Sequence, residues 1–261
     1  MSSRIPRVAS AFGTGSLLPG PALLHLLFPS CCASCGAARR GVGGGGLCRA
    51  CWKALPLLDR TSACERCALP SAGPLCRACA SVAPPVWGAA SVATYEGVAR
   101  RLVHALKFRG HDTLVAPSGA LMAAAARERG FDDRLDAVVP IPSTVRRNRE
   151  RGYDPGALLA EEVARRLGRP LRALLSRVRE APPQSRVPAA ERPRNVRGAF
   201  ASSPRARGLR LLLVDDVMTT GATAFEAART LRAAEASSVA LLVLARTPEA
   251  GTSHPDPPET T

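Results

Sequence analysis

The stretch 211–223 carries side chains suited to holding a sugar phosphate. It reads LLLVDDVMTTGAT, so the adjacent carboxylates of Asp215 and Asp216 follow an apolar run of strand type. Carboxylates accept hydrogen bonds from sugar hydroxyls. Small hydroxyl residues and Gly221 then lead into an apolar-periodic helix, whose free N–H groups and dipole favour a phosphate. The stretch therefore predicts a sugar-phosphate site. The alternative is an ordinary strand, polar turn and helix with a threonine N-cap.

The cysteines predict structural zinc. All nine lie between residues 31 and 79, and eight of them form four CxxC pairs. One pair offers two thiolates from a tight turn, and two pairs complete a closed tetrahedral site. We expect neighbouring pairs to combine, with Cys31 outside either site. The predicted zinc ligands are Cys32, Cys35, Cys48 and Cys51 for one site and Cys64, Cys67, Cys76 and Cys79 for the other.

Interleaved pairing of the four CxxC turns, disulfide bonds and redox chemistry remain as alternatives for these cysteines. A closed all-cysteine site has no open coordination position, so it indicates a structural role rather than a catalytic one. A segment this short also buries little apolar surface. Metal binding is therefore expected to supply its folding free energy.

Cationic residues suggest a second anionic contact. Lys107 ends a predicted helix and is one of only two lysines in the chain. The segment 142–153 holds four arginines after a predicted strand, and arginine forks bind phosphate oxygens in pairs. We therefore expect Lys107, Arg149 and Arg151 to contact a pyrophosphate. The alternatives are a solvated helix-end cation for the lysine and a solvated basic helix or DNA contact for the arginines.

These groups need strands and helices to position them. Strands that alternate with helices predict an α/β fold with a mostly parallel sheet, whose ligands lie at the carboxyl ends of the strands. A polar segment spanning 184–186 and 192–200 suggests a lid over that edge. The predicted elements are helices at 22–28, 97–108, 114–129, 158–167 and about 224–235, and strands at 87–95, 135–141, 171–178, 211–214 and 238–246.

Composition narrows the classes of function. The 261 residues are 46% hydrophobic and carry a formal charge of +15, which permits an anionic substrate or nucleic acid as partner. The basic residues are scattered, and there are only two Trp, two Tyr and six Phe for stacking on bases. The longest early apolar run, 22–28, is far shorter than the ~20 residues of a membrane span. We expect no membrane insertion and a cytoplasmic location.

The order of motifs resembles the ComF family, whose members join a double zinc ribbon to a phosphoribosyltransferase domain. The motifs are the CxxC pairs, YEGVAR at 95–100, LKFRG at 106–110, VVPIP at 138–142, RERGY at 149–153, ERPRNVRGAF at 191–200 and the stretch 211–223. One departure is Asp154-Pro155, where the family often has an Asn-Gln pair, so any role of those amides is in doubt here.

The resemblance implies a type I phosphoribosyltransferase fold that binds phosphoribosyl pyrophosphate (PRPP) with Mg²⁺. Asp215 and Asp216 would hold the ribose hydroxyls. The 5′-phosphate would lie on Met218, Thr219, Thr220, Gly221, Ala222 and Thr223. The family is linked to competence and DNA uptake, so single-stranded DNA or DNA-processing proteins are expected partners. The acceptor of the phosphoribosyl group stays unidentified.

Four segments follow from these patterns. We expect a variable or disordered tail at 1–21, a double zinc ribbon at 22–83, a phosphoribosyltransferase-like domain at 84–246 and a disordered tail at 247–261. The leading interpretation is a phosphoribosyltransferase. The alternatives are a non-enzymatic adaptor that senses PRPP or helps to process DNA, and a redox or metal-delivery protein, which leaves residues 85–246 unexplained.

Overall fold

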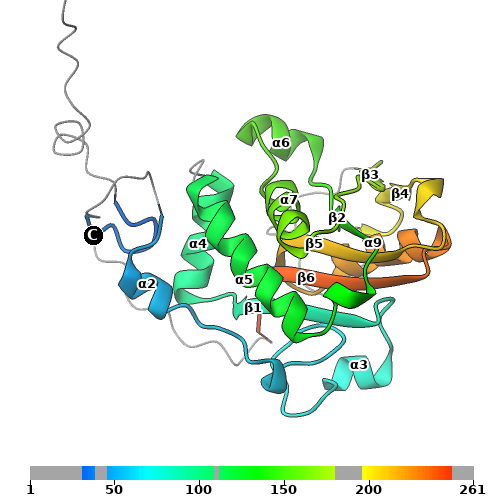
Figure 1. Cartoon of the computed structure of the whole chain (residues 1–261), viewed down its shortest axis with the longest axis horizontal. Coiled ribbons are helices and arrows are strands. Elements are labelled where there is room, and N and C mark those ends of the chain that lie inside the picture. Colours follow the sequence, from blue (N-terminus) through cyan, green and yellow to red (C-terminus); the bar gives the residue numbers. More distant parts are fainter. Residues whose placement is uncertain (1–30, 39–45, 109–111, 180–195, 249–261) are drawn as a thin grey trace, which may run out of the picture.

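A parallel sheet forms the centre of the molecule. The computed structural model describes residues 31–38, 46–108, 112–179 and 196–248. Four parallel strands lie in the order β1-β6-β5-β2 with helices on both sides (Figure 1), which confirms the predicted α/β architecture. A small antiparallel pair, β3 with β4, lies beside it. The strands are β1 (Gly88–Thr94), β2 (Ala137–Pro140), β3 (Leu175–Arg177), β4 (Phe200–Ser202), β5 (Arg210–Met218) and β6 (Ser238–Arg246).

Longer helices cover the sheet, and short ones belong to the cysteine region or to connections. The α-helices are α2 (Arg49–Lys53), α3 (Arg77–Ser81), α4 (Gly97–Phe108), α5 (Val115–Glu128), α6 (Val145–Arg151), α7 (Pro155–Leu167) and α9 (Ala222–Ala233). The 3₁₀ turns are η1 (Arg60–Ser62), η2 (Asp112–Leu114), η3 (Asp132–Arg134) and η6 (Pro204–Ala206).

Side chains of β5 alternate between two apolar cores. Leu212 and Val214 pack in the core that contains α4, α5 and α7. Leu211 and Leu213 pack in the core that contains α9 on the other face. Because both faces are covered, a continuous apolar run is compatible with a strand, and all four residues are fully buried.

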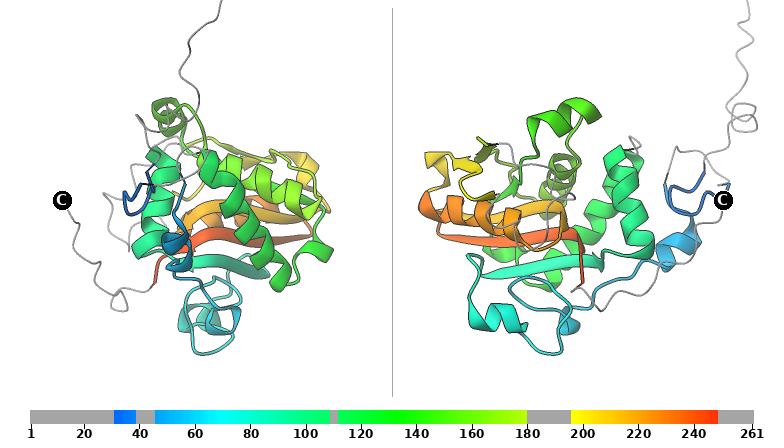
Figure 2. Two further views of the ribbon diagram at one scale, coloured as in Figure 1. Left: turned by 60° about the vertical axis from the view of Figure 1, so that its left-hand side comes forward. Right: turned by 180° about the vertical axis from the view of Figure 1, so that it is seen from behind.

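The cysteine region divides into two modules that pack on different parts of the domain. The first module, residues 31–38 and 46–54, lies beside α4, where Arg101 Nε donates to Ser34 Oγ at 2.8 Å. The second module, residues 63–81, lies against the α9 face of the sheet (Figure 2). There the backbone N–H of Ala89 donates to the carbonyl of Glu65 at 2.7 Å.

The connection between the modules covers the edge of the sheet. The backbone N–H of Leu58 donates to Val92, and that of Thr94 donates to Pro56, both at 2.9 Å. These bonds run antiparallel along β1, the outer strand on that side. An otherwise open strand edge is thereby paired, which removes a site for unwanted strand addition.

Several predicted boundaries differ from the structure. The helix predicted at 158–167 begins at Pro155, because Asp154 caps it by accepting from the N–H groups of Gly156 and Ala157. The strand predicted at 171–178 contracts to β3, with only an isolated bridge at Leu171. The helices predicted at 97–108 and 114–129 and the strand at 238–246 are confirmed to within one residue.

The prediction that the strand at 211–214 ends before the two carboxylates is wrong. β5 continues through Asp215 and Asp216 to Met218, because β6 stays in register with it as far as the Met218–Arg246 pair. The predicted helix at 22–28, both predicted tails except residues 247 and 248, and most of the predicted lid lie outside the described residues. The four predicted segment boundaries stay predictions.

Candidate functional site

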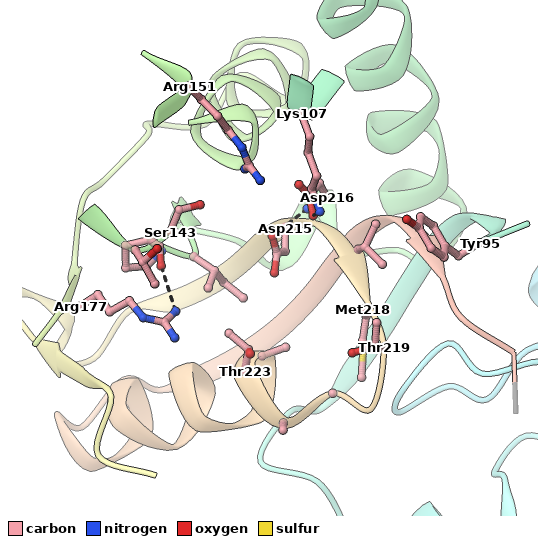
Figure 3. A pocket seen from close by; sticks show the side chains of 17 residues that line it. Tyr95, Lys107, Ser143, Arg151, Arg177, Asp215, Asp216, Met218, Thr219 and Thr223 are labelled. Carbon is pink, nitrogen blue, oxygen red and sulfur yellow. Dashed lines mark hydrogen bonds and ion pairs between the residues drawn. The ribbon is translucent and has the colours of Figure 1, made fainter. Parts of the chain in front are cut away.

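A cavity of about 230 Å³ opens where β1, β2 and β5 end. Because the sheet is parallel, the carboxyl ends of its strands lie along one edge, and residues far apart in the sequence meet there (Figure 3). Its lining residues are Tyr95, Lys107, Ile141, Pro142, Ser143, Thr144, Arg151, Arg177, Asp215, Asp216, Val217, Met218, Thr219, Gly221, Ala222, Thr223 and Ala224.

The two carboxylates and one ammonium form the polar centre of the cavity. Lys107 Nζ lies 2.9 Å from Asp216 Oδ1, and Asp216 is almost fully buried. Asp215 Oδ1 accepts from the backbone N–H of Asp216 at 2.8 Å. The lysine at the end of α4 therefore has a definite partner, and the interpretation as a merely solvated helix-end cation does not hold.

The environment of Asp215 favours its protonated form. Burial, followed by the neighbouring charge of Asp216, raises the pKa of Asp215 to about 8, although Lys107 acts in the opposite direction. At neutral pH the pair therefore carries less than two negative charges. A ligand that brings cations or hydroxyl donors to this edge makes the fully ionised pair more favourable.

This raised pKa predicts a pH-dependent cost to folding. Between pH 6 and 8 the folded chain holds a proton on Asp215 that the unfolded chain has released, so stability falls as pH rises through that window. Asp215→Asn removes this dependence and keeps an oxygen for the Asp216 N–H. We expect the variant to gain about 1 kcal/mol per pH unit over wild type across the window, measured by denaturant unfolding. A constant difference between the two proteins would contradict the raised pKa.

The turn after β5 is shaped for an anion. We call residues 218–223 the phosphate loop. Gly221 has φ of 83° and precedes α9, and no side chain caps that helix. A Cβ at Gly221 would lie 2.5 Å from the Met218 methyl group and 2.7 Å from the ring of Phe225, so only glycine fits the turn. The first turn of α9, whose dipole favours an anion, lines the cavity through Ala222, Thr223 and Ala224.

The predicted site residues are brought together in large part. Of the phosphate-loop residues, all but Thr220 line the cavity; Thr220 is exposed, and its Oγ1 accepts from the Ala222 N–H at 3.4 Å. Arg151 also lines the cavity, and its guanidinium stacks 4.8 Å from the centre of the Phe108 ring. Arg149 is exposed on α6 and is not among the lining residues, so its contact with pyrophosphate stays a prediction.

Other cavity residues were not predicted. Arg177 on β3 reaches the carbonyl of Pro142 at 3.5 Å and lies over the ring of Phe200. Tyr95 follows β1, and Ser143 follows β2. Tyr95 and Ser143 follow predicted parallel strands directly, and this position could have identified them as site residues. No such pattern marks Arg177, because its approach to the cavity depends on the β3–β4 pairing.

Asp154 gives the unusual Asp154-Pro155 pair a structural role. Besides capping α7, it accepts from the Ser143 N–H at 3.2 Å and from the Asn148 amide at 3.4 Å. It thereby holds the turn that follows β2 against the start of α7. Tyr153 adds a bond from its hydroxyl to the Leu106 carbonyl at 2.6 Å, which fixes the segment next to Lys107.

The cysteines form two groups, as predicted from neighbouring CxxC pairs. Within each group the four Sγ atoms lie within 4.8 Å of one another. The Cys35–Cys48 and Cys67–Cys76 Sγ atoms are 3.8 and 3.7 Å apart. A tetrahedron with 2.3 Å zinc–sulfur bonds has edges of about 3.8 Å, so the sulfur positions fit zinc. We call Cys32, Cys35, Cys48 and Cys51 the first cluster and Cys64, Cys67, Cys76 and Cys79 the second cluster.

Backbone N–H groups favour a thiolate at Cys32 in the first cluster. The N–H of Cys48 donates to Cys32 Sγ at 3.2 Å, and that of Cys51 donates to Cys48 Sγ at 3.4 Å. Burial raises the pKa of Cys32, but bonds from backbone N–H groups outweigh it and lower the pKa to about 6. Cys31 belongs to neither cluster, and all nine cysteines are free of disulfide bonds.

Within the part of the chain that the structure describes, no helix has the length and apolar character needed to cross a bilayer.

Comparison with known proteins agrees with this arrangement. The double zinc ribbon domain family matches residues 23–85, and the phosphoribosyl transferase domain family matches residues 154–259. The DNA utilization protein YhgH of Salmonella typhimurium is 34% identical over 209 residues, covering 77% of this chain and 91% of that protein. Competence protein ComFC of Bacillus subtilis is 31% identical over 156 residues, covering 58% of this chain and 62% of that protein.

One similar solved structure is that of the allosteric regulatory enzyme of purine biosynthesis, with 19% sequence identity and a TM-score of 0.38. The match covers 54% of this chain and 30% of the enzyme's chain. That likeness is too low to support a functional conclusion. The identity and coverage of the sequence relatives, together with the two matched domains, decide the classification. The chain belongs to the ComF family of proteins that join a double zinc ribbon to a phosphoribosyltransferase domain.

Proposed function

We propose that this chain binds PRPP with Mg²⁺ and transfers the phosphoribosyl group to an acceptor. The observation that supports the proposal most strongly is one cavity lined by both carboxylates, most of the phosphate loop and three cations, Lys107, Arg151 and Arg177. A sugar bearing phosphates at both ends needs hydroxyl acceptors in the middle and anion sites on either side. A simple ribose phosphate would leave Lys107 and Arg151 without a function in binding.

Each part of PRPP is assigned to its own group of residues. Asp215 and Asp216 accept hydrogen bonds from the 2′- and 3′-hydroxyls. The phosphate loop receives the 5′-phosphate at the start of α9. Lys107 and Arg151 neutralise the pyrophosphate, and Arg149 joins them from α6. Because Lys107 pairs with Asp216 in the unliganded chain, it shares or exchanges that partner when pyrophosphate arrives.

The polar side chains of the cavity suit Mg²⁺. Among the described residues they are carboxylates, hydroxyls and cations, without a thiol or imidazole, and Mg²⁺ prefers oxygen ligands. When bound with PRPP, the ion supplies positive charge that stabilises the departing pyrophosphate. In the transfer, the bond between C1′ and the pyrophosphate oxygen breaks, and its electron pair leaves with the pyrophosphate. The acceptor then donates an electron pair to C1′, while Lys107 and Arg151 stabilise the leaving group electrostatically.

The cellular setting is proposed from the relatives. The names of the YhgH and ComFC proteins refer to DNA utilization and competence, so single-stranded DNA or DNA-processing proteins are the proposed partners. A chain with nine free cysteines, eight of them in metal-ligating spacing, fits a reducing compartment, and we place it in the cytoplasm.

One observation favours a second candidate, a non-enzymatic adaptor. Arg146 and Arg149 are exposed on α6, outside the lining of the cavity. A chain with a formal charge of +15 could use such a helix and its zinc ribbons to contact nucleic acid while PRPP acts only as a signal.

A pyrophosphate-release assay separates the two candidates. The zinc-loaded full chain is mixed with PRPP, Mg²⁺ and a panel of nucleobases and other nitrogen acceptors, and released pyrophosphate is measured. We expect release with at least one acceptor, and Lys107→Met should lower it at least tenfold. PRPP binding without release across the panel, together with salt-dependent binding of single-stranded DNA, would instead support the adaptor.

A further inference from the structure

One buried arginine connects the second cluster to the phosphate loop. Arg246 is the last residue of β6, and only 6% of it is exposed. Its Nε donates to the Cys67 carbonyl at 3.1 Å. Its Nη1 donates to the Met218 carbonyl at 3.1 Å and also to the carbonyl of Thr219. The same side chain therefore bonds to the backbone of a predicted zinc ligand and to the first two residues of the phosphate loop.

These bonds determine how the loop presents its amides. In a trans peptide the C=O and the following N–H point in opposite directions, and the described residues contain no cis peptide. With the Met218 and Thr219 carbonyls directed at Arg246, the N–H groups of Thr219 and Thr220 point away from the guanidinium. Arg246 is not among the cavity-lining residues, whereas Met218 and Thr219 are (Figure 3).

The backbone of Arg246 also supports the cavity. Its carbonyl accepts from the N–H of Tyr95 at 2.8 Å, at the point where β1 ends. Tyr95 lines the cavity as well. One residue thus holds both the phosphate loop and the neighbouring strand end.

The position of the Cys67 carbonyl depends on the knuckle around it. The Cys64 N–H donates to the Leu69 carbonyl, and the Ala68 N–H donates back to the Cys64 carbonyl, both at 2.8 Å. Ala68 has a left-handed φ of 54°, which tertiary constraints must hold because the conformation is unfavourable for alanine. Four thiolates bound to one metal would supply such a constraint.

The positive charge of Arg246 is a second connection to the second cluster. A buried guanidinium is costly without a counter-charge. The guanidinium of Arg246 bonds to the backbone of Cys67, a member of the second cluster, and so lies beside that cluster. Four thiolates on one zinc ion would leave a net negative cluster, so the second cluster with its metal would serve as the counter-ion.

We propose that Arg246 is a positioning residue through which the second cluster controls the phosphate loop. This inference rests on the proposed PRPP function, because the loop is the proposed 5′-phosphate site. Loss of metal from the second cluster should loosen the loop and weaken phosphate binding. The first cluster packs against α4 instead, so its loss should affect the loop little.

The first test uses hydrogen exchange on the unliganded full chain, which needs no ligand. Arg246→Lys keeps the positive charge but loses the separate Nε and Nη1 donors of the guanidinium. Cys79→Ser removes a ligand of the second cluster and leaves Arg246 in place. We expect both variants to exchange amides of residues 218–224 at least threefold faster than wild type. The matched controls are Cys48→Ser in the first cluster and Arg210→Lys, whose arginine pairs with Asp136 at the opposite end of β5. Both should leave this peptide unchanged.

The second test uses calorimetry with ribose 5-phosphate, which probes the loop without pyrophosphate. We expect Arg246→Lys and Cys79→Ser to weaken binding at least tenfold and the two controls to change it less than twofold. Unchanged exchange and affinity in a folded Arg246→Lys variant would overturn the coupling. Faster exchange in the two variants, with no ribose 5-phosphate binding by wild type, would support the coupling and count against the proposed function.

Discussion

Replacing both carboxylates of the cavity, Asp215→Asn with Asp216→Asn, is expected to weaken PRPP binding about 100-fold or more. Each carboxylate is assigned a hydroxyl of the ribose, and hydrogen bonds to a charged acceptor contribute about 1.5–3 kcal/mol each. The asparagines keep the shape and one acceptor oxygen, so the loss reports charge rather than volume. Calorimetric titration of PRPP in the presence of Mg²⁺ measures the effect.

A matched control distinguishes this result from a loss of folding. Asp136 pairs with Arg210 at the opposite end of β5, with Asp136 Oδ1 2.8 Å from Arg210 Nη2. Asp136→Asn should therefore leave PRPP affinity within about twofold of wild type. Because Asp216→Asn also removes the partner of Lys107, thermal unfolding of the double variant must accompany the titration. Unchanged PRPP affinity in the folded double variant would make the ribose assignment wrong.

Removal of zinc is expected to have the largest effect on stability. The modules contain short helices and isolated bridges, and the second cluster forms part of an apolar core that it shares with the sheet and α9. Structural zinc in comparable peptides contributes about 10–16 kcal/mol, which exceeds the stability of a typical domain. We expect two zinc ions per chain by elemental analysis, and a drop in melting temperature of at least about 10 °C after chelation.

The chain supplies its own control for the metal assignment. Cys76→Ser should reduce the zinc content to about one per chain, because it removes one ligand of the second cluster. Cys31→Ser should retain two zinc ions, since Cys31 belongs to neither cluster. A zinc content below one in the wild-type chain, or an equal loss of zinc in both variants, would contradict the two-cluster assignment.

Local patterns predicted most of the longer elements and the two groups of cysteines. The CxxC spacing identified the ligands because two thiolates from one turn reach one metal whatever the rest of the chain does. The helix at 97–108 was predicted because its apolar residues recur with helical spacing, and Lys107 at its end does reach the cavity. The turn before α9 was predicted because Gly221 and its neighbours mark the start of a helix, and its binding of phosphate stays a proposal.

Long-range pairing could not be predicted in the same way. The extension of β5 through Asp215 and Asp216 depends on the register with β6, which local sequence does not encode. The approach of Arg177 to the cavity depends on the short β3–β4 pair. Arg246 is one of 36 basic residues, and nothing in the local sequence sets it apart. Its proposed role rests on its burial and on its bonds to the carbonyls of Cys67, Met218 and Thr219.

The most direct measurement of the central proposal is a calorimetric titration of PRPP into the wild-type, zinc-loaded full chain, with and without Mg²⁺. We expect about one PRPP bound per chain, with a dissociation constant of roughly 1 μM to 1 mM that Mg²⁺ improves, as is usual for metabolite sites. A folded chain with two zinc ions that shows no PRPP binding in either condition would contradict the assignment of the cavity.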